Sequence, residues 1–274
     1  TPHASAALEI KDNVRGVLIP RMTAATRQAI ATPAKGLLVF QDDVESGFWF
    51  YNGTAWTKLA DAGTSSGWSL SGNAATTESF IGTTNETPLV FKIKNLKSGI
   101  IDSAQRNTAF GFKSLFDNTT GWNNVAIALR ALQKNTEGYS NAAIGNFALY
   151  ENTTGYDNAA IGNSALLYNT TGYSNAAIGN SALRRNTSGS YNVATGNSAL
   201  LYNTSGSNNT AQGFNALFAN TTGFSNVAVG SDALYSNTTR SNLVAVGDSA
   251  LYSNTEGIGN TAIGSKSLFA NTTG

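Results

Sequence analysis

Residues 158–174 read NAAIGNSALLYNTTGYS, and residues 175–191 read NAAIGNSALRRNTSGSY. The two stretches share their small residues, a glycine, a leucine, an Asn-Thr pair and a closing glycine. The same pattern returns every 17 residues from residue 107 to residue 274 without an insertion, so ten units fit. Because each residue type meets its own copy one unit later, this register predicts a solenoid with one coil per unit.

Within one unit the residue types predict where strands and turns lie. Small and β-branched residues at 175–178 favour a short strand, and Gly179 ends it where the chain must turn. Residues 181–183 suit either a second strand or one helical turn. Residues 186–189, Asn-Thr-Ser-Gly, are typical of a turn in which the closing glycine takes a positive φ. The fold class is therefore mostly β, with a parallel β-solenoid (β-roll) of ten 17-residue coils.

One asparagine per unit, followed by Thr, predicts a ladder of side-chain amides along the solenoid, because stacked in-register asparagines bond to one another. The same Asn-Thr-Thr triplets match a glycosylation acceptor, but any turn of this composition produces that match. The predicted ladder consists of Asn118, Asn135, Asn152, Asn169, Asn186, Asn203, Asn220, Asn237, Asn254 and Asn271.

A composition change marks the start of the array. Residues 1–106 carry 10 basic and 9 acidic side chains, against 7 and 7 in the 168 residues that follow. The predicted parts are an N-terminal β-rich module with a short helix (1–62), a linker with a β-hairpin module (63–106) and the repeat solenoid (107–274).

Inside the first two parts, the pattern predicts these elements: buried strands at 17–19 and 36–40, a helix at 24–30 capped by Thr23 and ended by Pro33, a hairpin of 48–51 with 55–57 across Asn52-Gly53, and a second hairpin of 89–93 with 97–101. Residues 63–67 are interpreted as a linker.

Composition excludes several function classes. There is no Cys and only one His, which removes thiolate metal sites and Cys nucleophiles, and the net charge of +1 argues against nucleic acid as a partner. No apolar run approaches the length of a membrane span. His3 stands alone near the terminus, and Asp42, Asp43 and Glu45 suit a solvated turn better than a calcium site. We therefore expect no enzyme, no cofactor and no metal site.

A thin core predicts self-association. Each unit supplies only two or three sizeable apolar side chains, so a parallel homotrimer would bury a second face. The residue before the first glycine is Phe, Ile or Val in eight units but Thr195 and Gln212 in two, which we expect at the trimer axis. We also expect an irregular turn at 240–243, where Arg240 replaces the closing glycine and Leu243 replaces an asparagine.

The first hundred residues resemble a known kind of protein. Residues 8–10, 15–23, 33–39 and 51–56 are similar to the opening module of repeat-bearing surface and phage-tail-fibre-like proteins common in Bacteroidetes, and residues 80–92 to a segment that follows it. The array resembles the heads of trimeric autotransporter adhesins, which have a shorter coil. This resemblance implies a trimeric fibre. Since the sequence starts at Thr1 and stops at a closing glycine, we expect a fragment or mature chain whose natural protein continues past Gly274.

The leading hypothesis is a structural segment of an extracellular fibre or filament, used for adhesion or as a tail-fibre-like shaft, on a cell surface or a phage-like particle. The alternative is a carbohydrate-binding surface module, with a surface glycan or protein receptor as partner. Ice binding by threonine rows is a third reading and is less favoured, because the threonines lie in turns. Candidate glycan contacts are Tyr139, Tyr156, Tyr173, Trp49 and Trp56.

Overall fold

The computed structural model describes residues 12–59 and 80–274. It divides the chain into two compact units, residues 1–81 and 82–274. The linker predicted at 63–67 lies outside the described residues, and the three-part division after residues 62 and 106 stays a prediction. In the second unit one sheet continues across residue 106, because the predicted second hairpin pairs with the first coil.

The first unit contains a four-stranded sheet in the order β1 (Arg21–Met22), β2 (Leu38–Gln41), β3 (Gly47–Tyr51) and β4 (Trp56–Lys58). The β3–β4 hairpin turns at Asn52-Gly53, as predicted, and Asn52 Oδ1 accepts bonds from the backbone of Thr54 and Ala55. Such side-chain to backbone bonds are why Asn favours this turn.

Helix α1 (Ala24–Gln28) begins where the sequence predicts, because the hydroxyl of Thr23 accepts a hydrogen bond from the N–H of Thr26. It ends two residues earlier than predicted. The buried strand predicted at 17–19 is wrong: the side chains of Val17 and Leu18 are 65% and 75% exposed and no strand forms there. An apolar run alone does not show whether a strand has a partner to pair with.

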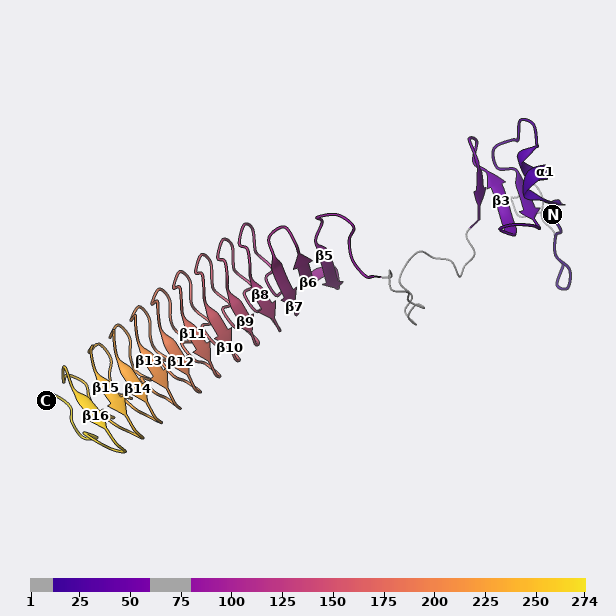
Figure 1. Ribbon diagram of the computed structural model, residues 1–274. Helices are drawn as coiled ribbons and strands as arrows, with labels where there is room; N and C mark the ends of the chain where they lie inside the picture. The colour runs from indigo at the N-terminus through magenta and orange to yellow at the C-terminus, as the bar shows by residue number, and fades with distance from the viewer. Residues whose placement is uncertain (1–11, 60–79) are drawn as a thin grey trace, which may run out of the picture. The chain divides into compact units, whose positions relative to one another are not determined.

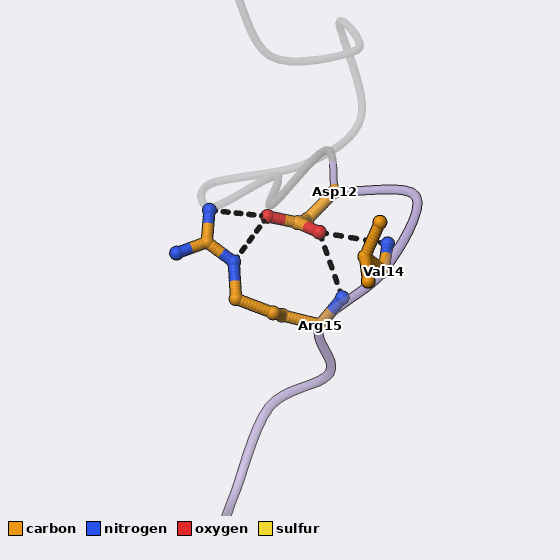
Figure 2. Close-up of polar contacts among 3 residues, drawn as sticks. All are labelled: Asp12, Val14 and Arg15. Carbon is orange, nitrogen blue, oxygen red and sulfur yellow. Dashed lines mark hydrogen bonds and ion pairs between the residues drawn. The ribbon is translucent and has the colours of Figure 1, made fainter.

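A charged turn opens the described part of the first unit. The carboxylate of Asp12 accepts hydrogen bonds from the backbone N–H of Val14 (2.8 Å) and Arg15 (2.7 Å) and forms an ion pair with the Arg15 guanidinium (Figure 2). These interactions, the Val14 bond foremost, hold the pKa of Asp12 below its ordinary value.

The second unit is one twelve-stranded sheet, continued by coil after coil (Figure 1). The predicted hairpin of β5 (Leu89–Ile93) and β6 (Leu96–Asp102) is antiparallel, and β6 pairs antiparallel with the first coil. The ten coil strands then run parallel: β7 (Asn107–Phe110), β8 (Val125–Ile127), β9 (Ala142–Ile144), β10 (Ala159–Ile161), β11 (Ala176–Ile178), β12 (Val193–Thr195), β13 (Thr210–Gln212), β14 (Val227–Val229), β15 (Val244–Val246) and β16 (Thr261–Ile263).

Adjacent coils are in register at a spacing of 17 residues, which confirms the predicted solenoid. Ala160 pairs with Ala177, and Leu166 and Leu183 lie at equivalent places, both fully buried with φ of 51°. The segment 181–183, left open above between strand and helix, is a turn in which Ser181 and Leu183 take left-handed backbone angles.

The core consists of two alanines and one leucine from most coils, such as Ala160, Ala165 and Leu166. A left-handed leucine costs on the order of 1 kcal/mol, whereas full burial of its side chain contributes about 1.5–3 kcal/mol. Burial therefore outweighs the backbone strain, and the small alanines allow the opposite walls of the coil to approach.

Candidate functional site

The predicted asparagine row lies inside the coils as a ladder of amide hydrogen bonds. In a regular coil the Nδ2 of the asparagine donates to the Oδ1 of the asparagine one coil earlier and to the carbonyl of the closing glycine of its own unit; for Asn169 both distances are 2.9 Å. Eight of the nine consecutive pairs in the array are joined in this way, at 2.7–3.2 Å. These amides are buried because their polar groups bond to one another.

A second ladder, which the sequence reasoning did not single out, runs beside the first. It is built by the asparagine that precedes each strand. The Oδ1 of Asn175 accepts from both the backbone N–H (3.0 Å) and the Nδ2 (3.1 Å) of Asn192, and the Nδ2 of Asn192 also donates to the carbonyl of Gly206. The sequence feature that could have predicted this second ladder is the recurrence of an asparagine at the first position of nine units.

Gln105 closes both ladders at their N-terminal end. Its Oε1 accepts from the Nδ2 of Asn107 and of Asn118, each at 3.2 Å, and its Nε2 donates to the carbonyl of Thr119. The first amide of each row therefore has an acceptor, although no coil precedes it.

The closing glycines are needed for space and not for a positive φ, so the reason given above for the irregular turn is wrong. Gly172 does not have a left-handed φ, but a Cβ there would lie within 3.0 Å of the ladder atoms of Asn169 and Asn186 and of the carbonyl of Gly189. The positive φ belongs to the other glycine of the unit, such as Gly179 at 135°.

The array is irregular where Arg240 replaces a closing glycine, at the predicted place. The carbonyl of Arg240 still accepts from the Nδ2 of Asn226 and Asn237, but no hydrogen bond joins Asn237 to Asn254. The Arg240 guanidinium instead forms an ion pair with Glu256 in the next coil. Leu243, which replaces an asparagine of the second ladder, is fully buried among apolar side chains.

Three of the predicted glycan-contact residues form a stack of rings. Trp122, Tyr139, Tyr156 and Tyr173 follow one another at 4.8–5.0 Å between ring centroids, with ring planes within 8° of parallel. Consecutive rings face each other along the solenoid, so the faces of Tyr139 and Tyr156 are covered. What these tyrosines present to a ligand is ring edges and hydroxyl groups.

The other two predicted contact residues lie in the first unit, beside a buried arginine. The Arg27 guanidinium carbon is 3.6 Å from the ring centroid of Trp49 and 5.6 Å from that of Trp56. Burial lowers the pKa of Arg27, against the opposing effect of Asp43 and Glu45. Arg27 therefore occupies one face of Trp49, a cation–π contact that stabilises the hairpin.

The outer face of the solenoid sheet is a stripe of apolar side chains. Alanines at the middle of each strand point into the core, and the residue before the glycine points outward because side chains alternate along a strand. Ile127, Ile144, Ile161 and Ile178 are 40–45% exposed on four adjacent strands. Further along the same row Gln212 is exposed and Thr195 half-buried.

In most coils the threonine that directly follows the ladder asparagine does not present a free hydroxyl group. The Oγ1 of Thr170 donates to the carbonyl of Thr187 (3.0 Å), and the same bond recurs along the array. Since these hydroxyls are bonded within the protein, this row offers few groups to ice or to another ligand.

The N-terminal residues are similar to a family described as the phage tail like trimerisation region. Its profile matches residues 1–77 of the 274. Together with the β-solenoid, this match supports a phage-tail-fibre-like protein with a fibre-like shaft. No curated protein and no solved structure matches the chain.

Two features are absent from the described residues. Residues 12–59 and 80–274 contain no group of three or more His, Cys, Asp or Glu side chains placed to hold a metal ion. In the same residues no helix has the length and apolar character that crossing a membrane requires.

Proposed function

We propose that this chain is a non-enzymatic shaft segment of an extracellular fibre, assembled as a parallel homotrimer and carried by a phage-like particle or a cell surface. The observation that carries the proposal is the apolar stripe on the solenoid sheet. Soluble monomers seldom leave a contiguous apolar surface of this kind open to water. The match of residues 1–77 to a trimerisation region supports an assembly of three chains, in which the other two chains cover the apolar stripe.

The polar residues in the stripe fit the same assembly. In a trimer with the stripe at its axis, three copies of Gln212 meet, and a side-chain amide has both donors and an acceptor with which to bond its copies. Thr195, one strand earlier, lies beside it in the same register. The pair is therefore accommodated at the axis, while the isoleucines of β8–β11 supply the apolar contact.

The solenoid suits a mechanical role. Consecutive coils are joined by backbone hydrogen bonds, and most of them also by amide-ladder bonds or stacked rings, so load along the array is shared by many hydrogen bonds. We propose no catalytic role for the shaft. Adhesion to a host or surface is the role that such a shaft would serve.

Sedimentation of the full chain tests the proposal. We expect a mass of three chains of 28.5 kDa, 3 × 28.5 = 85.5 kDa. The double variant Ile161→Lys/Ile178→Lys places charges in the stripe and is expected to weaken the trimer, whereas Asn163→Lys/Asn180→Lys, on exposed positions of the same coils, is the matched control.

A wild-type mass of 28.5 kDa rejects the trimer. A double variant that stays fully trimeric at low concentration rejects the stripe as the interface. Release of reducing ends from a polysaccharide by the purified protein would contradict the absence of catalysis.

A further inference from the structure

The first ring of the aromatic stack, Trp122, has one covered face and one open face. Its ring lies 5.0 Å from that of Tyr139, centroid to centroid, with planes 3° apart. On the opposite side of Trp122, the equivalent position one coil earlier is Gln105. The backbone shows this equivalence: the N–H of Asn123 donates to the carbonyl of Gln105, and the N–H of Ser140 donates to the carbonyl of Trp122 in the same way. The side chain of Gln105 is turned inward, to close the two asparagine ladders. Within residues 12–59 and 80–274, no side chain is therefore stacked on the outer face of Trp122.

A cavity of about 300 Å³ occupies this place. Ala104, Gln105, Arg106 and Trp122 line it. Trp122 is 42% exposed, and Arg106 is exposed as well. The Arg106 guanidinium forms no ion pair, hydrogen bond or ring contact with any residue that the structure describes. The cavity thus combines an open aromatic face with a free cation.

A larger cavity of about 460 Å³ beside Tyr168 is less suited to a ligand. Its carboxylate, Glu151, is paired with Lys134 at 2.8 Å. Its cation, Arg185, lies 4.8 Å from the ring centroid of Tyr202. A ligand there would have to compete with contacts that already exist, whereas the groups beside Trp122 are unengaged.

We propose that Trp122 and Arg106 form a binding site for a sugar ring that carries a carboxylate, a uronic acid. The apolar face of a pyranose ring packs on an indole face, and a guanidinium binds a carboxylate through two parallel hydrogen bonds. The volume is at the small end of the range for ligand sites and suits one ring with its hydroxyl groups toward water. This site is separate from the proposed glycan contacts at Tyr139, Tyr156 and Tyr173, and it does not depend on the fibre being a trimer.

The test uses the full chain labelled with 5-fluorotryptophan, so that fluorine NMR reports each tryptophan. The signal of Trp122 is assigned by its loss in Trp122→Phe. The chain is titrated with methyl β-D-glucuronide, with methyl β-D-glucoside, which lacks only the carboxylate, and with benzoate, an aromatic acid. We expect the glucuronide to shift the Trp122 signal saturably, and the glucoside to bind at least about tenfold more weakly, since a charge-assisted bond is lost.

The matched variants are Arg106→Asn and Arg130→Asn. Both arginines have a φ of 56°, a backbone angle that Asn tolerates, so the backbone accepts both changes. Arg130→Asn also removes the contact of that guanidinium with the ring of Phe147. Arg106→Asn is expected to weaken glucuronide binding at least about tenfold and Arg130→Asn to leave it unchanged. Equal binding of glucoside and glucuronide, an unchanged affinity in Arg106→Asn, or shifts confined to the other tryptophans would overturn the site. Benzoate binding as tightly as the glucuronide would overturn the sugar as its ligand.

Discussion

The side-chain oxygen of Asn237 has no hydrogen-bond partner, because the amide of Asn254, one coil further on, does not donate to it. Asn254 donates to the carbonyl of Gly257 alone. Every other consecutive pair in this row of the array is bonded. This pair differs from the others because Arg240 takes the place of the closing glycine. At the closing glycines a Cβ would lie between the two ladder asparagines, and Arg240 carries a Cβ at this position.

Arg240→Gly is therefore expected to stabilise the array. A buried oxygen without a partner costs about 1–3 kcal/mol, and the exposed ion pair with Glu256 that is lost contributes at most about 1 kcal/mol. A net gain of about 1 kcal/mol in the free energy of unfolding should be visible by denaturant titration. The reverse change in a regular coil, Gly223→Arg, should destabilise the array by a similar or larger amount. A destabilised Arg240→Gly would show that the ion pair outweighs the ladder.

The second ladder predicts a ranking of substitutions at Asn192. Asn192→Ala leaves the backbone N–H of Asn209 without a partner, removes one of the two donors to the carbonyl of Gly206 and opens a cavity, so we expect a loss of about 2–4 kcal/mol. Asn192→Leu fills the space, as Leu243 does naturally, and should cost less. Asn180→Ala, on an exposed position, is the control and should stay within about 0.5 kcal/mol. Equal losses for Ala and Leu would mean that side-chain volume contributes little at this position.

The N-terminal turn predicts an acid-dependent change. Because the pKa of Asp12 is lower in the folded chain than its ordinary value of 3.8, the turn's contribution to stability is present above pH 3.8 and is lost as pH falls through the folded pKa. The amide signals of Val14 and Arg15 should shift together in that range in an NMR titration. Asp12→Asn should abolish the shared transition; its persistence in the variant would assign it to another carboxylate.

The ring stack predicts a loss of stability in alkali. Burial of the phenol, with the neighbouring Tyr173 and Tyr139, raises the pKa of Tyr156 above its ordinary value of 10.0. A raised folded pKa means that the stack's contribution is fully present below pH 10 and is lost as pH rises through the folded pKa. Thermal unfolding between pH 9 and about 11.5 should show a falling midpoint, and Tyr156→Phe should reduce the fall. Tyr51→Phe, in the first unit, is the control. An identical fall in Tyr156→Phe would exclude this tyrosine as a cause.

The repeat could be predicted from the sequence because every residue type recurs at the same spacing. The in-register alanines (Ala160 and Ala177), the glycine after the strand and the Asn-Thr turn each have a local backbone preference. The same residue types recur at the same spacing in the next coil, so these preferences also fix the register between coils. The hairpin at Asn52-Gly53 and the helix capped by Thr23 were predictable for the same reason, since each depends on a few neighbouring residues.

Other features were decided only when the coils were in place. The need for glycine at Gly172 arises from asparagines in two coils, and Gln105 could be assigned to the ends of both ladders only once they lay beside it. The exposure of Val17 and Leu18 depended on whether a neighbouring strand was present, which the local pattern does not contain.

The period, the short strands, the turns and the ladder asparagines could all be read from the order of residues, because they follow from residue type and from identity across units. The tertiary structure decided which ring faces are covered, where Arg240 interrupts the ladder, and that Trp122 and Arg106 share a cavity. The physical reason is distance: these features depend on which atoms come within a few ångströms across coils, and spacing in the sequence alone does not fix where the side chains of 105, 106 and 122 point.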